Sequence, residues 1–253
     1  MALKAMVTGA SGGIGLEFAE RLAKAGYQVT VVARNAAKLD ELVQRLGDGH
    51  RALAADLSVQ EDWRRVAADV RATQYDLLIN NAGVGVYGKF CDASLDANAA
   101  MMRLNMDSLV ELSHAFLSVA KKGDALMNVA STLALLSFPG ATTYCATKAF
   151  VLAFSEGLWF EQRPKGVYVC ALLPGVTKTN FHEASGGKPE HAPPAAITQT
   201  AAQVVDVAMK ALKRRKRPTI LTSFMNKAMC FVTNRLMTRK AMVGMMGGQS
   251  PVK

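Results

Sequence analysis

The sequence has few cysteines and no pattern that would link them. Its four cysteines, in 253 residues, are Cys91, Cys145, Cys170 and Cys230, and none forms a Cys-x-x-Cys pair or a Cys/His cluster with metal-ligand spacing. Zinc sites and disulfide frameworks need such spacing, so we expect no metal site and a reducing, cytoplasmic location. Cys145 follows Tyr144 directly, and we expect it to be a small buried thiol and not a nucleophile.

Long apolar runs are missing as well. No stretch of about 18 uncharged apolar residues is present, so we expect no membrane-spanning helix. The first residues lead directly into a strand pattern, which indicates no signal peptide. No internal repeat or interior linker appears, and half of the residues are hydrophobic, which is enough to bury one large core in a single domain.

Acidic residues are nearly absent from the C-terminal fifth of the chain. The net charge is +10, yet residues 1–202 carry 19 basic and 19 acidic side chains. Residues 203–253 carry 11 basic side chains and a single acid, Asp206. We expect no nucleic-acid binding, because neither interleaved aromatic residues nor a recognition motif accompanies this charge.

What the sequence does have is a regular alternation of strand and helix patterns from residue 4 to residue 222. Strands are expected at residues 4–8, 28–33, 51–55, 75–79, 125–130, 166–173 and 219–222. Helices are expected near residues 14–26, 36–46, 60–72, 98–121, 144–162 and 199–213. This order predicts an α/β fold, a doubly wound sheet of about seven parallel strands (a Rossmann fold) over residues 1–223. A C-terminal helical extension, residues 224–253, is expected to belong to the same domain or to lie at its periphery.

A glycine-rich turn joins the first expected strand to the first helix. It reads Gly9-Ala10-Ser11-Gly12-Gly13-Ile14-Gly15. Strand, glycine turn and helix form the context that a dinucleotide fingerprint requires. Glycines let backbone N–H groups approach a pyrophosphate at the positive end of the helix, so we expect a nucleotide here.

The end of the second strand favours NADP(H) over NAD(H). An enzyme that uses NAD usually places an acid near this point to hold the ribose 2′-hydroxyl, but here Ala33 and Arg34 occupy it. A guanidinium suits a 2′-phosphate, and Ser11 is positioned to add a hydroxyl. The alternative is that Arg34 is a surface residue that opens the next helix. Asp56, at the end of the third strand, either touches the adenine or caps a turn.

Residues 131–148 carry a candidate proton-transfer site. Tyr144 and Lys148 stand four residues apart and share one face of the expected helix. A neighbouring ammonium favours the phenolate, so we expect a lowered pKa for Tyr144. Ser131, at the end of a strand, is placed to hydrogen-bond a substrate oxygen, which suits chemistry on an alcohol or a carbonyl. The spacing alone also fits a chance pair on a solvated helix, and the nucleotide turn favours the functional interpretation.

Four other stretches carry expectations. Asn105, within an apolar helix, is either a satisfied core amide or a functional group aimed at the site. The helix at 144–162 is apolar on more than one side, which predicts contact with a partner subunit. Residues 178–199 form a loop long enough to be a mobile lid. Residues 244–253 are expected to be frayed.

The C-terminal extension combines methionine with positive charge. A basic run occupies residues 213–217, and six of the thirteen methionines lie between residues 225 and 246. The apolar positions at helical spacing in residues 224–243 are Met225, Ala228, Met229, Val232 and Leu236. Such a surface can wall an apolar pocket or lie on a membrane. The alternative is a helix packed on its own domain with a solvated basic face.

Taken together, these motifs resemble the short-chain dehydrogenase/reductase family, in the branch with a GxxxGxG glycine turn. The resemblance covers roughly residues 3–223. It rests on the run from Thr8 to Gly15, on Asn80-Asn81-Ala82-Gly83, Asn105, Ser131, Tyr144-x-x-x-Lys148 and Pro174-Gly175-x-Thr177, in the family's order and spacing.

The resemblance implies a role for each matching residue. Tyr144 would be the general acid in carbonyl reduction and the base in alcohol oxidation, and Ser131 would orient the substrate oxygen. Lys148 would bind the nicotinamide ribose, and Asn105 would hold a water of a proton relay. The implied cofactor contacts, besides Tyr144 and Lys148, are Gly9, Ser11, Gly13 and Ile14 at the pyrophosphate and adenosine end, Arg34 at the 2′-phosphate, Asp56 and Leu57 at the adenine, Asn81, Ala82 and Gly83 at the adenosine-side ribose, and the loop of Pro174, Gly175 and Thr177, with Thr177 at the carboxamide.

The expected function is therefore that of an NADP(H)-dependent oxidoreductase that interconverts a ketone or aldehyde and an alcohol. The extension is loosely similar to that of hydroxysteroid and long-chain 3-oxoacyl reductases, which favours an apolar or lipidic substrate. The alternative is a non-catalytic NADP-binding sensor that uses its basic tail to bind partners. We further expect a homodimer or homotetramer, with peripheral membrane contact through residues 213–243 left open.

Overall fold

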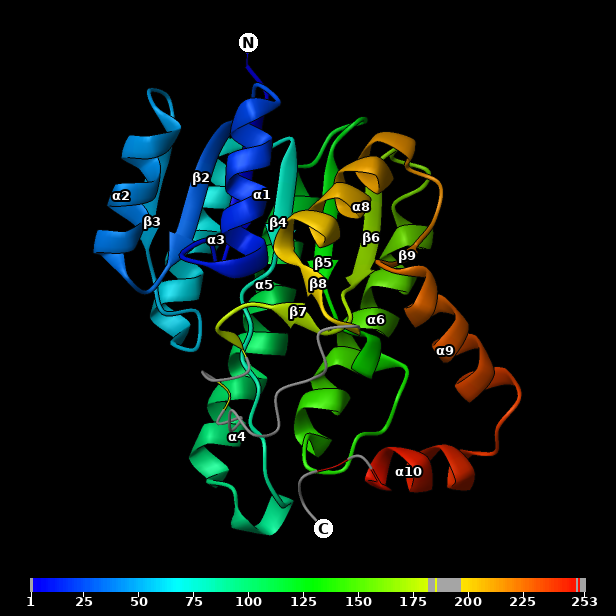
Figure 1. The fold of residues 1–253 in the computed structure, drawn as a ribbon. Helices are drawn as coiled ribbons and strands as arrows, with labels where there is room; N and C mark the ends of the chain where they lie inside the picture. The colour runs from blue at the N-terminus through cyan, green and yellow to red at the C-terminus, as the bar shows by residue number, and fades with distance from the viewer. Residues whose placement is uncertain (1, 182–184, 186–196, 249, 251–253) are drawn as a thin grey trace.

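The core of the fold is one sheet of seven parallel strands. The computed structural model describes residues 2–181, 185, 197–248 and 250. The strand order is β3-β2-β1-β4-β5-β6-β9, so the chain winds outward from β1 to one edge and from β4 to the other (Figure 1). The strands are β1 (Lys4–Thr8), β2 (Gln28–Ala33), β3 (Arg51–Ala54), β4 (Leu77–Asn80), β5 (Ala125–Val129), β6 (Tyr168–Leu173) and β9 (Thr219–Leu221). The doubly wound Rossmann fold is confirmed.

Helices cover both faces of this sheet (Figure 1). One face carries α1 (Gly13–Lys24), α2 (Ala36–Leu46) and α8 (Ala201–Arg214), and the other carries α3 (Gln60–Thr73), α5 (Ser108–Val119) and α6 (Thr142–Glu161). Successive strand residues serve opposite cores: Val7 packs with Phe18 of α1, and Met6 packs with Val66 of α3. Both faces are buried, which explains why the strands read as continuous apolar runs.

The expected helix at 98–121 begins earlier and contains an irregular turn. Its segments are α4 (Leu95–Met102), a π-helical turn η2 (Arg103–Asp107) and α5. A π turn adds one residue to a helical turn, and such turns occur frequently at functional sites. Asn105 lies in this turn and is 1 % exposed. Two short 3₁₀ turns, η1 (Phe90–Asp92) and η3 (Thr132–Ala134), lie in neighbouring loops.

The stretch expected to be a loop at 178–199 begins and ends in a small parallel pair of strands, β7 (Thr177–Lys178) and β8 (Gln199–Thr200). Most of the expected lid falls outside the described residues.

The C-terminal extension differs from the expectation. It forms two helices, α9 (Phe224–Arg235) and α10 (Arg239–Gly248), where the sequence predicted one helical stretch and a frayed end after residue 243. The expectation of a frayed end is wrong for residues 244–248, which belong to α10, a helix that buries Met242 and Met246 against Leu136 of the sheet domain. Residues 249 and 251–253 of the expected frayed end lie outside the described residues. None of the described helices has the length and apolar character needed to cross a membrane.

Candidate active site

The motif residues meet at the carboxyl ends of the central strands. The glycine turn follows β1, Asn81 to Gly83 follow β4, Ser131 follows β5, and Pro174 to Thr177 follow β6. In an open parallel sheet this edge is where ligands bind, at the point where the strand order reverses. The structure therefore brings together segments that lie far apart in the sequence.

The glycine turn depends on its glycines for geometry. Gly9 has a positive φ of 69°, and a Cβ there would lie 2.8 Å from Asn81 Nδ2. A Cβ on Gly15 would collide with the carbonyl oxygen of Gly9, so helix α1 packs directly on the turn. Only glycine permits this close approach of helix and strand.

The amino end of α1 fits the pyrophosphate of a dinucleotide. No side chain caps this end, and its first turn has no acidic residue. Gly12, the residue before the helix, has open space where a Cβ would be, whereas a Cβ on Gly13 would lie 2.9 Å from Thr179 Cγ2. Uncapped N–H groups at a positive helix end attract an anion. Ser11 is partly exposed beside this opening, and Ile14 packs on the core beneath it.

Asn81 and Ala82 hold the turn in place. The Asn81 amide donates to the Thr8 carbonyl oxygen at 2.9 Å, and the Thr8 hydroxyl accepts hydrogen bonds from the backbone N–H groups of Asn81 and Ala82. These bonds join the ends of β1 and β4. In the structure the two residues have this positioning role, and Thr8 is a member of the site that sequence analysis did not assign.

Of the three residues expected at the adenosine end, Arg34 has an exposed side chain, whereas the side chains of Asp56 and Leu57 are engaged within the protein. The Arg34 side chain is 72 % exposed and 4.0 Å from the Asp56 carboxylate. The other oxygen of that carboxylate accepts from the backbone and the hydroxyl of Ser58, so Asp56 does cap a turn. The Leu57 side chain is buried in the core, so any contact with an adenine is left to its backbone. Arg34 remains available to a 2′-phosphate.

Ser131 and Tyr144 form the centre of the site. The Ser131 hydroxyl accepts from the Leu133 backbone N–H at 3.1 Å and hydrogen-bonds the Tyr144 phenol. The backbone N–H of Thr132 donates to the Pro174 carbonyl oxygen at 2.9 Å, which ties this segment to the loop of Gly175. The Thr177 hydroxyl donates to the Gly175 carbonyl oxygen, so that loop has an internal bond as well.

Burial raises the pKa of the Tyr144 phenol, and the Ser131 hydrogen bond only partly opposes this. The expectation of a lowered pKa is therefore wrong. The spacing revealed the nearby cation, with Lys148 Nζ 5.7 Å from the ring centroid, but not the loss of water around a phenol that is only 6 % exposed. Tyr144 is thus a protonated phenol near neutral pH.

Lys148 is a buried cation that pairs with no carboxylate of the described residues. Its side chain is 4 % exposed, and burial lowers its pKa to about 8. Nζ donates to the Val129 carbonyl oxygen at 2.9 Å. A Cβ on Gly83 would lie 3.3 Å from Nζ and 3.1 Å from Asn105 Oδ1, so Gly83 gives the two side chains their space. An ammonium has three donors, and this one fits ribose hydroxyls.

The Asn105 amide is almost fully used within the protein. Its Nδ2 donates to the Val84 carbonyl oxygen and to the Thr147 hydroxyl, and its Oδ1 accepts from the Val84 N–H. Only the second lone pair of Oδ1 is left for the expected water. Thr147 was missed by sequence analysis, because a hydroxyl within the Tyr-x-x-x-Lys segment carries no signal of its own.

The side of Tyr144 away from the sheet is apolar. The Tyr144 and Phe181 rings lie 5.6 Å apart, and the same cluster includes Val84, Leu133 and Phe138. The buried face of α10 reaches the same segment through Met242 and Met246. Cys145 is buried here with a raised pKa caused by burial, as expected of a structural thiol.

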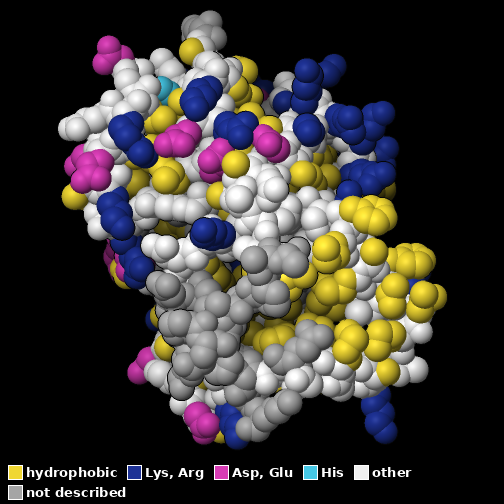
Figure 2. Space-filling view, viewed as in Figure 1, with side chains coloured by type: hydrophobic (Ala, Val, Ile, Leu, Met, Phe, Trp, Pro, Cys, Tyr) yellow, Lys and Arg dark blue, Asp and Glu magenta, His cyan; other side chains and the backbone are white. Residues whose placement is uncertain are grey.

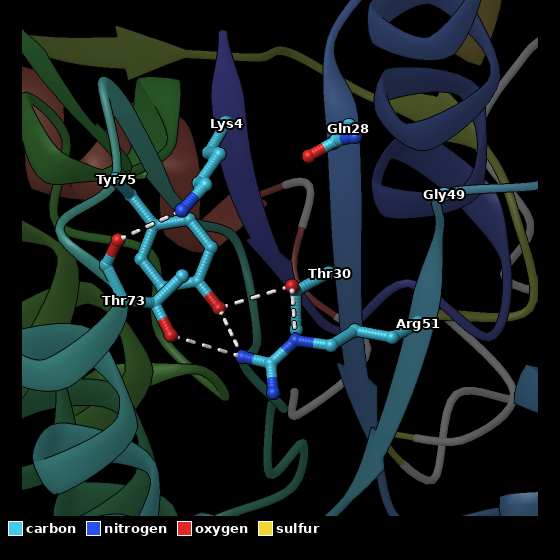
Figure 3. A pocket seen from close by; sticks show the side chains of 7 residues that line it. All are labelled: Lys4, Gln28, Thr30, Gly49, Arg51, Thr73 and Tyr75. Carbon is cyan, nitrogen blue, oxygen red and sulfur yellow. Dashed lines mark hydrogen bonds between the residues drawn. The ribbon is translucent and has the colours of Figure 1, made fainter. Parts of the chain in front are cut away.

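A polar cavity lies at the amino ends of the strands, at the opposite end of the sheet from the motif residues (Figure 3). This cavity of about 180 Å³ is lined by Lys4, Gln28, Thr30, Gly49, Arg51, Thr73 and Tyr75. One Arg51 nitrogen contacts both oxygens of the Asp69 carboxylate and the Tyr75 hydroxyl, and Nε donates to the Thr30 hydroxyl. These groups satisfy one another, and none of the motif residues lies here.

Comparison with known proteins agrees with the geometry. The family model described as short chain dehydrogenase matches residues 4–189. The chain belongs to the short-chain dehydrogenase family. This confirms the resemblance noted from the motifs.

Relatives within this family include enzymes and solved structures. A human very-long-chain 3-oxoacyl-CoA reductase is 30 % identical over 189 residues, which is 70 % of this chain and 60 % of that protein. A Sphingobium yanoikuyae short-chain dehydrogenase in complex with NADPH is 30 % identical, with a TM-score of 0.81 over 93 % of this chain and 97 % of that one. A bulky-bulky ketone specific alcohol dehydrogenase from Comamonas testosteroni is 29 % identical, with a TM-score of 0.76 over 93 % and 95 %. This chain is thus an oxidoreductase of the short-chain dehydrogenase family, and it spans about three fifths of the human relative.

Proposed function

We propose that this short-chain dehydrogenase uses NADP(H) to interconvert an apolar ketone or aldehyde and the corresponding alcohol. The observation that carries the proposal is the buried, neutral phenol of Tyr144, hydrogen-bonded by Ser131 and close to the uncompensated Lys148. A nicotinamide dinucleotide, when bound, supplies or accepts the hydride at the substrate carbon.

The chain's own residues manage the proton. In reduction, the Tyr144 hydroxyl gives its proton to the carbonyl oxygen as that oxygen gains charge, and the Ser131 hydroxyl holds the same oxygen by a hydrogen bond. The phenolate left behind is stabilised by the Lys148 ammonium and then regains a proton. In oxidation the phenolate accepts the alcohol proton. The raised pKa keeps Tyr144 protonated near neutral pH, which is the form that reduction requires.

Arg34 supports the NADP(H) preference. Family membership alone does not decide it, since solved relatives include complexes with NADPH and with NAD. Arg34 is exposed directly after β2, and the backbone N–H of Ala10 in the glycine turn donates to the Val32 carbonyl oxygen at 3.2 Å, so the turn borders the end of this strand. A guanidinium at this point suits a 2′-phosphate. The nearby Asp56 is engaged with Ser58 and 4.0 Å away, so it neutralises the guanidinium only weakly.

The Arg34→Asp variant tests this preference directly. The ratio of kcat/KM for NADPH to that for NADH should fall by about tenfold or more, the expected loss from a charge-assisted phosphate contact. Arg45→Asp, on the exposed face of α2, is the control and should leave the ratio unchanged. An unchanged ratio in Arg34→Asp would refute the role of Arg34.

The apolar wall around Tyr144 supports an apolar or lipidic carbonyl, of 3-oxoacyl or steroid-like size. The human relative is named for a very-long-chain 3-oxoacyl-CoA, and the Comamonas relative for bulky ketones. An NADPH-oxidation screen across 3-oxoacyl thioesters, steroid ketones and small aldehydes tests the class, and we expect the long or bulky carbonyls to give the higher kcat/KM. Uniform inactivity would contradict the proposal. A purely nucleotide-sensing role gains no support from the site, because it needs no buried phenol beside Ser131.

We also propose that the enzyme is cytoplasmic and forms a homodimer or homotetramer through α6. Phe150 and Phe160 of this helix are 39 % and 67 % exposed, and the Phe150 and Phe154 rings stack at 5.7 Å. Sedimentation velocity of the wild type and of Phe160→Ser tests this, because loss of an exposed apolar anchor should shift an oligomer toward monomer.

A further inference from the structure

Helix α9 turns its apolar residues away from the protein. Phe224, Phe231 and Leu236 are 84 %, 60 % and 70 % exposed, and Met225, Met229 and Val232 are exposed as well. The sequence left open whether the stripe of Met225, Ala228, Met229, Val232 and Leu236 packs on its own domain. In the structure all five are exposed, four of them among the six side chains just named. At 3.6 residues per turn, the six side chains cover about 160° of the helix circumference. We call them the outer face of α9.

The opposite side of the same helix makes the contacts with the domain. Cys230 and Thr233 are buried there, and the Asn226 amide lies against Gly175 in the loop after β6. The outer face is therefore not the side by which α9 packs on the domain. Large contiguous apolar surface on a protein marks an interaction site.

Positive charge lies beside the outer face, and the extension itself carries no acid. Residues 207–253 contain no Asp or Glu, and the exposed run at 213–217 is basic throughout. Figure 2 shows hydrophobic side chains gathered over α9, directly below a group of Lys and Arg at the end of α8. Lys227, Arg235 and Arg239 add exposed cations within the extension.

This combination selects one partner. We propose that the outer face of α9 docks on the surface of an anionic lipid bilayer, with its apolar side chains at the acyl boundary and the cations on the headgroups. An apolar helix face rimmed by Lys and Arg is the signature of interfacial binding. A second copy of this chain fits poorly, because a symmetric contact would place the two acid-free, basic extensions together.

The docking surface lies close to the candidate active site. Asn226 contacts Gly175 from the inner side of α9, and α10 packs its methionines on Leu136, between Ser131 and Tyr144 in the chain. A substrate dissolved in the bilayer would then enter beside these helices. The docking itself rests on α9 and its charges alone, whereas the delivery of a lipidic carbonyl rests on the proposed function.

Co-sedimentation of the full chain with vesicles tests the docking. We expect binding to vesicles of phosphatidylcholine mixed with phosphatidylglycerol to exceed binding to pure phosphatidylcholine by at least about tenfold, and to weaken with added salt. The double variant Phe231→Ser, Leu236→Ser should lose about tenfold or more, since it removes two large side chains from the acyl boundary. Phe90→Ser, which removes an equally exposed phenylalanine (60 %) from η1, should bind as the wild type does.

A charge variant separates the two contributions. Lys216→Glu with Arg217→Glu should weaken binding to the anionic vesicles by roughly fivefold or more for each charge changed. Equal binding to neutral and anionic vesicles, or no binding to either, would overturn the proposal. Loss of self-association in the Phe231→Ser, Leu236→Ser variant, measured by sedimentation velocity without lipid, would assign the face to a second copy instead.

Activity assays keep this inference distinct from the proposed function. With a small water-soluble ketone, the outer-face variants should keep the wild-type kcat/KM. With a long-chain carbonyl supplied in anionic vesicles, their kcat/KM should fall together with vesicle binding. Vesicle binding by an enzyme that reduces no carbonyl would leave the docking intact and refute the proposed function alone.

Discussion

The amino ends and the carboxyl ends of the parallel strands, which we call the amino edge and the carboxyl edge of the sheet, carry similar groups in different electrostatic states. At the amino edge, Tyr75 and Arg51 meet the hydroxyl of Thr30 (Figure 3), and the Asp69 carboxylate, which the figure does not draw, neutralises the guanidinium. At the carboxyl edge, Tyr144 lies beside the hydroxyl of Ser131, Lys148 Nζ is 5.7 Å from the Tyr144 ring centroid, and none of the described carboxylates pairs with the ammonium. Each edge therefore holds a phenol, a cation and a hydroxyl.

The two edges differ in whether a carboxylate balances the charge of the cation. The hydrogen bond that Arg51 donates to the Asp69 carboxylate is the main cause of the raised pKa of Arg51, so that cation is fixed in its charged form. Burial without a counter-charge lowers the pKa of Lys148 to about 8 and leaves donors of its ammonium for a ligand. A compensated cluster stabilises the fold, whereas an uncompensated one is available for chemistry.

Replacing one phenol at each edge should separate these roles most clearly. Tyr144→Phe should lower kcat for carbonyl reduction by about a thousandfold, because it removes the proton donor, while the Kd for NADPH stays within about twofold. Tyr75→Phe should leave kcat unchanged and lower the free energy of unfolding by about 1 kcal/mol through its lost hydrogen bonds. Steady-state kinetics, nucleotide titration and urea unfolding make the measurements. Substantial turnover in Tyr144→Phe would remove the basis of the comparison.

Replacing one glycine at each edge tests the same comparison in the backbone. In Gly15→Ala the new Cβ meets the Gly9 carbonyl oxygen, so α1 must shift and the Kd for NADPH should rise by about tenfold. Gly49→Ala, at the amino-edge cavity, forces a side chain onto a φ of 85° and should cost about 1 kcal/mol of stability. Its Kd for NADPH should not change. Equal Kd values for the two variants would show that the packing of α1 on the turn does not govern cofactor binding.

The two cations should respond differently to pH. The pKa of Lys148 is about 8 in the folded protein and about 10.4 when unfolded, so the unfolded chain binds more protons between these values. Stability contributed by this group therefore rises with pH, by about 1.5 kcal/mol between pH 8 and 9.5. Urea unfolding of wild type and Lys148→Met should show the difference.

Arg51→Met is the matched control for this pH dependence. The pKa of Arg51 is raised above an already high value, so the guanidinium stays charged through this window in both states. The variant should change stability by the same amount at pH 8 and at pH 9.5. A wild-type stability that is flat with pH after subtraction of Lys148→Met would contradict the burial of an uncompensated ammonium.

The smallest effect is expected from breaking the compensation at the amino edge. Asp69→Asn removes the carboxylate from Arg51, whose side chain is 48 % exposed, so water and salt screen the pair. The free energy of unfolding should fall by no more than about 1 kcal/mol, and less at high salt, with kcat unchanged. A loss of activity in this variant would mean that the amino edge is coupled to the site.

The sequence predicted the sheet and the meeting of the motif residues, because both follow from local rules. Apolar runs and amphipathic stretches alternate along the chain, and the carboxyl ends of parallel strands meet at one edge. The motif residues, of which Gly9 comes first and Thr177 last in the chain, could therefore be assigned to that edge from the sequence. The short-chain dehydrogenase motifs then identified the family.

The remaining features depend on three-dimensional context. The direction of the Tyr144 pKa shift is set by desolvation, which the spacing to Lys148 does not reveal. The outer face of α9 shows a helical period, but the period does not say which side meets the protein. Thr8 and Thr147 act through single hydroxyl groups: Thr8 belongs to the glycine-turn motif, which does not indicate what its hydroxyl binds, and Thr147 has no sequence pattern. The amino-edge cluster joins residues from several elements and has none either.

The π-helical turn at Arg103–Asp107 has a geometric consequence for the whole segment from α4 to α5. Each residue of an α-helix advances the direction of its side chain by about 100° around the axis. The additional residue of the π turn therefore rotates the side chains of α4 around the helix axis relative to those of α5. Helix α5 can thus keep its apolar side on the sheet while Asn105 points at Val84 and Thr147. Deleting a residue of this turn other than Asn105 would rotate the amide about the helix axis, away from both partners, and would leave the residues of the site unchanged.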